Sequence, residues 1–97
     1  MLIFSNHLRK HLEDIRNYMK GFNDIDPLGS EVLSFLERVK GTLQVPNTRL
    51  GEIERWRVII HFKSCAKIRY IIAKNKNNEL ILVTAHPDPD ADKYIEF

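Results

Sequence analysis

The sequence feature that most constrains the fold is a change of period at Arg55. From Arg55 to His86 apolar and polar side chains alternate every second residue, the spacing of a β-strand with one buried face. The alternation is interrupted at Ser64 to Ala66 and at Asn75 to Asn78, of which the second, with three asparagines, is a strong hairpin signal. Three strands joined by two hairpins are therefore expected. Pro87-Asp88-Pro89-Asp90 ends them, because a proline cannot donate to a ladder.

The N-terminal part has a helical period instead. Ser5 is a good N-cap, and apolar residues recur at helical spacing from Leu8 to Phe22. Turn residues occupy 21–29, and a second helix is expected from Ser30 to Gly41. We therefore predict one α+β domain over 1–97, with two N-terminal helices packed on one face of a three- to four-stranded antiparallel meander. Its parts are a helical region 1–41, a sheet 42–86 that includes a possible short strand at 42–45, and an acidic tail 87–97.

The hairpin registers follow from keeping the apolar residues on one face. A loop of Ser64 to Ala66 pairs Lys63 with Lys67 and His61 with Arg69. A four-residue loop of Asn75 to Asn78 pairs Lys74 with Glu79, which brings Arg69 beside Thr84 and Lys67 beside His86. The core face then holds Val58, Ile60, Phe62, Ile68, Tyr70, Ile72, Ile81 and Val83. The open face gathers His61, Lys63, Lys67, Arg69, Thr84 and His86.

Charge and cysteine content narrow the environment and the partners. Residues 49–78 carry a net charge of +6 and residues 79–97 a net charge of −4. The basic stretch suits a phosphate-rich partner, although a solvated sheet face would have the same composition. Cys65 is the single cysteine, so no internal disulfide can form. No apolar run approaches the roughly 20 residues that span a bilayer, and no secretion signal is evident, so we expect a cytoplasmic protein without a membrane partner.

The open-face side chains suit phosphoryl-transfer chemistry on RNA. A histidine can take a proton from a 2′-hydroxyl or give one to a leaving oxygen, and Arg or Lys can stabilise the charge on the phosphate. No cofactor is needed, because RNA supplies its own nucleophile. His7, His11 and Asp14 lie one helical turn apart and could surround a metal ion, but no third histidine is near in sequence and no Cys pair is present. We therefore expect no metal; His7 could instead reach the sheet.

Three short segments carry a resemblance to a known family: Phe4-Ser5-Asn6-His7, Lys67-Ile68-Arg69-Tyr70-Ile71-Ile72 and Leu82-Val83-Thr84-Ala85-His86-Pro87-Asp88. With the order of elements, they resemble the barnase–EndoU–colicin–RelE superfamily of small toxin ribonucleases, of the phage and contact-inhibition type. That superfamily has N-terminal helices on a four-stranded antiparallel meander whose open face carries the active site. The acidic stretch after the last strand and Glu52-Ile53-Glu54-Arg55-Trp56 before the central strand depart from the RelE branch, which places the likeness nearer to the colicin and EndoU branches.

The function expected from these observations is that of a metal-independent endoribonuclease toxin, which cleaves RNA by attack of the 2′-hydroxyl on the phosphate. His61 and His86 are the predicted proton-transfer pair. Lys67 and Arg69 would hold the phosphate, which Thr84 would orient. Arg57, Lys63 and His7 are predicted to bind the flanking RNA. The resemblance also implies a cognate antitoxin or immunity protein. The alternative is a non-catalytic immunity protein, antitoxin or nucleic-acid adaptor, whose docking surface would be the acidic tail.

Overall fold

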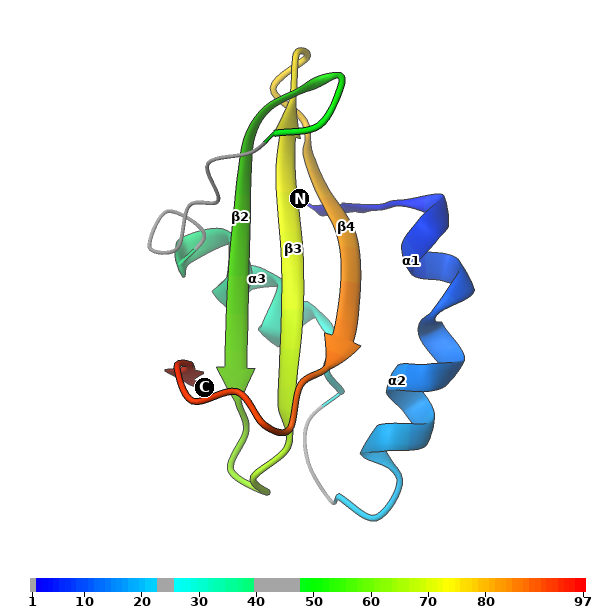
Figure 1. Cartoon of the computed structure of the whole chain (residues 1–97), viewed down its shortest axis with the longest axis vertical. Helices are drawn as coiled ribbons and strands as arrows, with labels where there is room; N and C mark the ends of the chain where they lie inside the picture. Colours follow the sequence, from blue (N-terminus) through cyan, green and yellow to red (C-terminus); the bar gives the residue numbers. More distant parts are fainter. Residues whose placement is uncertain (1, 23–25, 40–47) are drawn as a thin grey trace.

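The computed structural model describes residues 2–22, 26–39 and 48–97, which form an α+β domain (Figure 1). In this part of the chain three helices accompany a five-stranded mixed sheet. None of its helices has the length and apolar character that crossing a membrane requires. The predicted strand at 42–45 and the predicted helix stop at Gly41 lie outside the described residues. In chain order the elements are β1 Leu2–Phe4, α1 Asn6–Lys10, α2 Leu12–Met19, α3 Ser30–Val39, β2 Glu52–His61, β3 Lys67–Asn75, β4 Leu80–Pro87 and β5 Ile95–Glu96.

The helices begin where the sequence predicts. Ser5 caps α1, because its side-chain oxygen accepts a hydrogen bond from the backbone N–H of Leu8 at 3.0 Å. The predicted first helix is divided at His11, whose N–H bonds to the Leu8 carbonyl three residues back instead of four. The second predicted helix begins at Ser30 as α3. The chain therefore turns slightly at His11 while α1 and α2 continue along one side of the sheet.

The sheet contains the predicted meander and two strands that the prediction missed. Its order is β1-β4-β3-β2-β5. β2, β3 and β4 pair antiparallel, as expected, whereas β1 pairs parallel with β4 and β5 pairs parallel with β2. The prediction of a purely antiparallel sheet was therefore wrong. β1 has three residues and β5 has two, which is too short for a period to be visible in the sequence.

Both hairpin loops are displaced from their predicted positions. Phe62 N–H donates to the Ala66 carbonyl at 2.8 Å, so the first loop is residues 63–65 and its third residue, Cys65, has a φ of 76°. Asn75 N–H donates to the Glu79 carbonyl at 3.1 Å, so the second loop has three residues in place of four, and its third residue, Asn78, has a φ of 62°. A left-handed third residue is typical of three-residue hairpins. Asn adopts this conformation readily, but a cysteine gives no such signal.

The displaced loops change which residues lie opposite one another. The predicted pairings of Lys63 with Lys67, His61 with Arg69, Arg69 with Thr84, Lys67 with His86 and Lys74 with Glu79 were all wrong. His61 pairs with Lys67, and Arg69 lies between Ile59 on β2 and His86 on β4. The β3–β4 register also shifts between Ile71 and Ile72, where β4 has one extra residue, so that Thr84 pairs with Ile71.

The predicted core face of β2 and β3 is confirmed. Val58, Ile60, Phe62, Ile68, Tyr70 and Ile72 are all fully buried. This is because the first loop moved the register by two residues, which preserves the face of every side chain. On β4 the shorter second loop moves the pairing by one residue and places Leu82 in the core opposite Ile72, in place of the predicted Ile81. The bulge then skips Val83, and Ala85 is the core residue opposite Tyr70.

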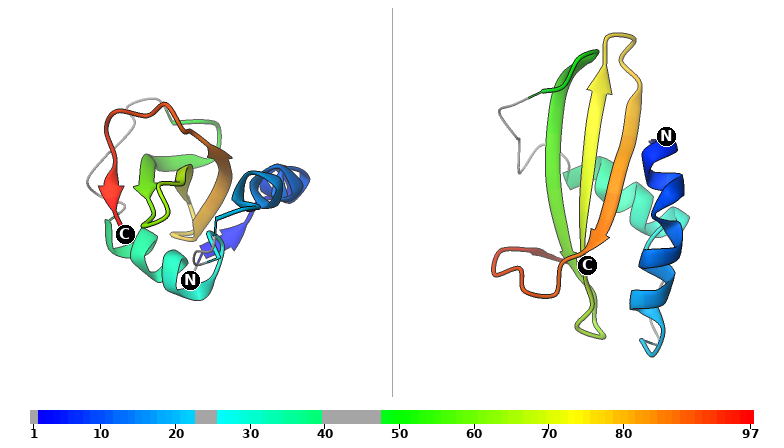
Figure 2. Two further views of the ribbon diagram at one scale, coloured as in Figure 1. Left: turned by 90° about the horizontal axis from the view of Figure 1, so that it is seen from below. Right: turned by 45° about the vertical axis from the view of Figure 1, so that its right-hand side comes forward.

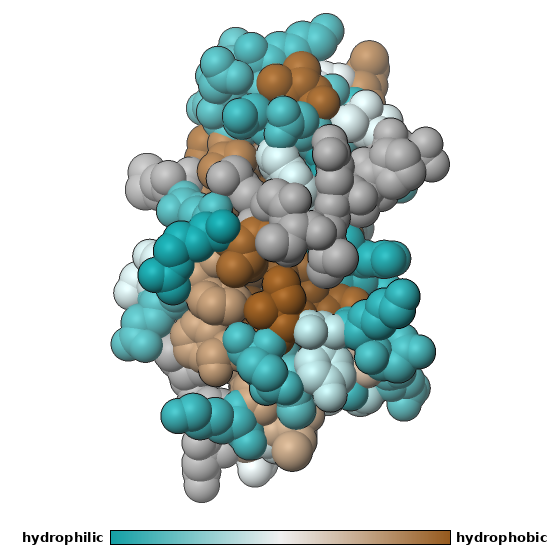
Figure 3. Space-filling model, turned by 90° about the vertical axis from the view of Figure 1, so that its left-hand side faces the viewer, coloured by the Kyte–Doolittle hydropathy of each residue, from teal (hydrophilic) through white to brown (hydrophobic). Residues whose placement is uncertain are grey.

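Different helices cover different parts of the sheet. α3 lies behind the sheet in Figure 1 and contributes Val32 and Leu36 to the core. α1 and α2 lie beside β4, where they contribute Leu8 and Ile15 (Figures 1 and 2). The expectation that both N-terminal helices cover one face was therefore only partly right. On the side of the molecule that carries β2, apolar side chains gather in the middle of the surface among hydrophilic ones (Figure 3).

The Tyr70 hydroxyl is a polar group buried in the core. It donates a hydrogen bond to the Pro27 carbonyl at 2.6 Å, which ties the turn before α3 to the centre of the sheet. Burial, reinforced by the nearby Asp26 carboxylate, raises the pKa of this phenol far above its usual range. Tyr70 therefore stays neutral and acts as a structural donor.

The acidic tail is folded against the sheet. The C-terminal segment, defined here as residues 88–97, leaves β4 and crosses the side of the sheet opposite α3, so that β5 reaches the outer edge of β2 (Figures 1 and 2). The Phe97 ring packs against Phe62 and Phe35, with centroid distances of 5.6 and 5.1 Å.

Candidate active site

Three imidazoles meet where α1 and α2 pass the end of β4. His7 comes from α1, His11 from the junction between α1 and α2, and His86 from β4. The ring centroids of His7 and His11 are 4.7 Å apart, those of His11 and His86 are 5.0 Å apart, and those of His7 and His86 are 6.5 Å apart. The prediction that His7 could reach the sheet is consistent with this position. We call His7, His11 and His86 the histidine cluster.

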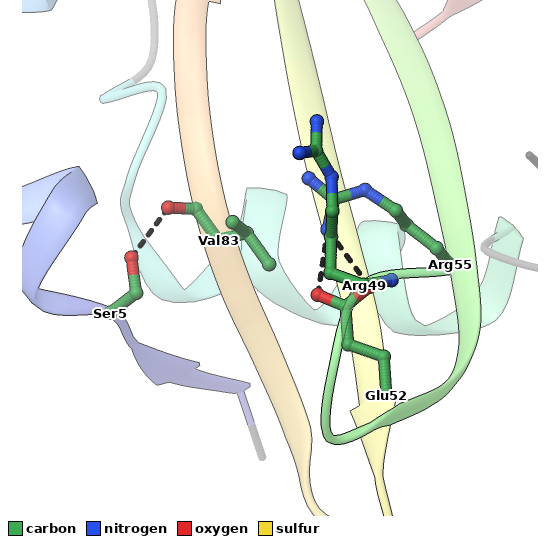
Figure 4. A network of polar contacts seen from close by, with 5 residues as sticks. All are labelled: Ser5, Arg49, Glu52, Arg55 and Val83. Atoms are coloured by element: carbon green, nitrogen blue, oxygen red, sulfur yellow. Dashed lines mark hydrogen bonds and ion pairs between the residues drawn. The ribbon is translucent and has the colours of Figure 1, made fainter. Parts of the chain in front are cut away.

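Ser5 places the helical half of this cluster. Its backbone N–H donates to the Leu82 carbonyl at 3.1 Å, and its hydroxyl donates to the Val83 carbonyl at the bulge of β4. The second of these bonds is drawn in Figure 4. The same hydroxyl oxygen caps α1. One side chain thus holds the start of the helix to β4, and His7 follows it by two residues.

The environment of His86 disfavours its protonated form. Its pKa is lowered chiefly by burial, and further by the neighbouring His11, Arg69 and His7, against a small opposing effect of Asp14. The Nε2 atom of His86 lies 2.8 Å from the Thr84 hydroxyl oxygen. When Nε2 carries the proton, Thr84 accepts it in a hydrogen bond, and the lone pair of Nδ1 is left to act as a base.

Arg69 is the cationic residue that pairs with His86 of the histidine cluster across the sheet. It lies directly opposite His86 in the β3–β4 ladder, so both side chains are on the open face. Its Nη1 atom is 3.8 Å from Asp88 Oδ2, and its side chain is 40% exposed. The guanidinium is therefore partly exposed on the open face, beside the carboxylate of Asp88. Thr84, in contrast, is nearly buried and contacts His86 instead of Arg69.

The structure does not bring the predicted proton-transfer pair together. His61 lies on β2, two strands away from His86 and two residues further along the ladder. Strand spacing and rise place their Cα atoms about 12 Å apart. His61 Nδ1 lies 2.9 Å from Glu96 Oε1, and its ring lies 4.7 Å from that of Tyr94. The predicted registers, with His61 in the row of Arg69 and His86 in the row of Lys67, also left the two histidines two strands and two residues apart, so the sequence pattern itself gave no direct contact between them.

Lys67 lies beside His61 and is also occupied by the C-terminal segment. Its ammonium donates to the Ala91 carbonyl at 2.8 Å and lies 4.6 Å from the centre of the Tyr94 ring. His61 and Lys67 thus form a second group, under the C-terminal segment and separate from the histidine cluster. No contact of this segment was predicted, because its docking depends on tertiary structure.

The remaining predicted binding residues are spread along the sheet. Arg57 is exposed on the same side of β2 as His61, and Lys63 is exposed in the first hairpin loop. At the other end of β2, Arg55 is paired with Glu52 through contacts of 2.9 and 2.6 Å, and the Arg49 backbone N–H also binds that carboxylate (Figure 4). The basic stretch is therefore not one continuous patch, since an acidic partner already neutralises Arg55.

His7, His11 and Asp14 do not form the metal site that their spacing allows. Across residues 2–22, 26–39 and 48–97, no group of three or more His, Cys, Asp or Glu side chains is arranged to hold a metal ion. Asp14 Oδ2 lies 3.4 Å from His11 Nδ1, which makes a salt bridge when His11 is protonated. His11 is the residue whose position beside His86 the sequence did not reveal, although its helical spacing from His7 was visible.

Comparisons with protein-family models, with curated proteins and with solved structures found no match for this chain. A functional assignment therefore rests on the geometry of the histidine cluster and its neighbours.

Proposed function

We propose that the protein is a metal-independent endoribonuclease whose active centre is the histidine cluster with Arg69 and Thr84. The observation that carries the proposal is that His86, with a lowered pKa, lies beside two further imidazoles and opposite a partly exposed arginine. Acid–base cleavage of RNA needs two proton-transfer groups near one phosphate and a cation to stabilise it. This combination occurs at the cluster and does not require His61.

In the proposed mechanism His86 is the general base. Because its pKa is lowered, its imidazole is neutral near pH 7 and can accept the proton of the 2′-hydroxyl. Thr84 is a positioning residue, which holds Nε2 and so leaves Nδ1 for proton transfer. The 2′-oxygen attacks the phosphorus, the bond to the 5′-oxygen breaks, and a 2′,3′-cyclic phosphate and a free 5′-hydroxyl result.

His11 is the proposed general acid, which gives a proton to the departing 5′-oxygen. Its ring lies 5.0 Å from that of His86, and Asp14 supplies a carboxylate partner for its protonated form. Arg69 binds the non-bridging phosphate oxygens. His7 flanks both rings. Lys67, Arg57 and Lys63 are the proposed contacts of the continuing RNA backbone. His61 becomes a backbone contact in this proposal instead of a catalytic residue.

The test is cleavage of a short RNA in the presence of EDTA, with the products identified by mass. We expect a cyclic phosphate end, and we expect His86→Ala and His11→Ala each to slow cleavage by about 10²–10⁴-fold. Lys76→Ala, which removes an exposed charge at the second hairpin loop, is the matched control and should cut at the wild-type rate. His61→Ala should lose less than the two cluster variants.

Three results would contradict the mechanism. Cleavage that EDTA abolishes would indicate a metal-dependent site. Cleavage of the same strand with a 2′-deoxy nucleotide at the cut would exclude attack by the 2′-hydroxyl. Binding of RNA without any cleavage would favour the alternative of a non-catalytic nucleic-acid adaptor. An antitoxin or immunity protein as the partner is a proposal that rests on the sequence resemblance.

A further inference from the structure

The C-terminal segment occupies the basic residues that RNA would need. Asp88 lies 3.8 Å from Arg69, the Ala91 carbonyl accepts from Lys67 at 2.8 Å, and Glu96 lies 2.9 Å from His61. Each contact places an oxygen against a cationic or imidazole group, as a phosphate oxygen would be placed. The segment thus follows the row of positive groups across β3 and β2.

The chemistry of the segment resembles that of a nucleic-acid strand. Residues 88–97 carry four carboxylates and one lysine, a net charge of −3. The Tyr94 ring lies against the His61 ring and beneath the Lys67 ammonium, at 4.7 and 4.6 Å. Stacking on an aromatic face and a cation–π contact are also the interactions that a nucleobase would make there. Tyr94 is nevertheless 41% exposed, so its ring is not enclosed by the protein.

The segment is held mainly at its two ends. At the start, Asp88 N–H donates to the Lys67 carbonyl at 3.0 Å, and at the end, Phe97 N–H donates to the His61 carbonyl at 3.1 Å. β5 pairs with β2 at only two positions. Exposed ion pairs contribute little and are weakened by salt. Ile95 and Phe97 pack against the core, but the residues between Asp88 and Ile95 have few buried contacts. This middle part therefore opens more easily than the sheet on which it lies.

We propose that the C-terminal segment is an intramolecular mask, which competes with the phosphates of RNA for Arg69, Lys67 and His61. This inference rests on the proposed function, because it takes RNA as the ligand of this face. RNA binds when the segment leaves the face, so the measured affinity is reduced by the fraction of molecules that are masked. Free protein is therefore held in a less active state.

The first test removes mask contacts without changing charge. Tyr94→Ala deletes the ring contacts with His61 and Lys67 at an exposed position, so the fold should survive. Its Kd for a short 2′-O-methyl RNA, which cannot be cleaved, should fall by about three- to tenfold relative to wild type. An unchanged Kd overturns the mask. A higher Kd, which means weaker binding, also overturns the mask and identifies Tyr94 as a base-stacking residue of the RNA site.

The second test separates contact from charge. The double variant Asp88→Asn with Glu96→Gln replaces the two carboxylates that face Arg69 and His61 with neutral amides, which removes both ion pairs. Asp90→Asn with Asp92→Asn removes two charges from exposed positions in the same segment. The first pair should tighten RNA binding clearly more than the second. Equal effects would mean that net charge alone is responsible, and would overturn the mask.

A third measurement observes the segment directly. Hydrogen exchange at the Phe97 amide should become faster when the 2′-O-methyl RNA binds, because the bond to the His61 carbonyl is broken. Slower or unchanged exchange contradicts displacement. If the mask variants bind RNA more tightly but no RNA is cleaved, the mask is supported and the nuclease proposal is refuted. If RNA is cleaved but the mask variants bind it as the wild type does, the nuclease proposal is supported and the mask is refuted. Binding by no variant overturns both.

Discussion

Replacement of Ser5 by alanine tests the junction that places the histidine cluster. The hydroxyl caps α1 through Leu8 and donates to the Val83 carbonyl of β4. Loss of a serine N-cap costs about 1 kcal/mol, and loss of one further partly buried hydrogen bond costs about 1 kcal/mol. We therefore expect Ser5→Ala to lower the free energy of unfolding by about 2 kcal/mol, which for a domain of this size lowers Tm by roughly 8–16 °C.

The assay is urea denaturation followed by circular dichroism, with Ser34→Ala as the matched control. Ser34 is exposed in the middle of α3, where alanine is the better helix former, so this variant should be neutral or slightly stabilising. Ser5→Thr keeps a hydroxyl and should recover much of the loss. The reasoning is refuted if Ser5→Ala unfolds at the same urea concentration as Ser34→Ala.

Three further outcomes follow from the structure. Cys65→Gly should raise the free energy of unfolding by up to about 1 kcal/mol in thermal or urea unfolding, because Cys65 has a φ of 76° that glycine adopts without strain. Because the folded-state pKa of His86 lies below its ordinary 6.5, the unfolded chain binds more protons between these two values, and the free energy of unfolding rises with pH there. His86→Gln should flatten that rise in urea titrations at a series of pH values. Lys67→Ala should reduce the slope of log Kd for RNA against log salt by about 0.7, and an unchanged slope would remove Lys67 from the interface.

Much of the fold could be predicted from local pattern. The alternation through Val58 and Tyr70 identified the buried face of the central strands, because a period of two has only one way to keep apolar side chains together. Ser5 and Ser30 marked the starts of helices for a similarly local reason, since a cap acts within its own first turn. These features depend on residues close together in the chain.

The strand registers could not be predicted uniquely, because a shift of two residues leaves every side chain on the same face of the sheet. Moving the first loop by one residue changed the partner of His61 from Arg69 to Lys67 without exposing any core residue, so the apolar pattern could not choose between them. The choice depended on a left-handed Cys65, a residue with no preference for that conformation. The bulge in β4 arises beside Val83, where Ser5 makes its bond from the other end of the chain.

Some features of the candidate site therefore follow from local sequence patterns, and others depend on contacts between distant parts of the chain. The sequence by itself determined that His86, Arg69 and Lys67 lie on the open face and that His7 and His11 share a helical side. Only the tertiary structure decided that the helical histidines meet His86 while His61 is covered by Tyr94 and Glu96. The physical reason is that α1 and β5 are positioned by contacts between the chain ends and the central strands, and such contacts leave no period in the sequence.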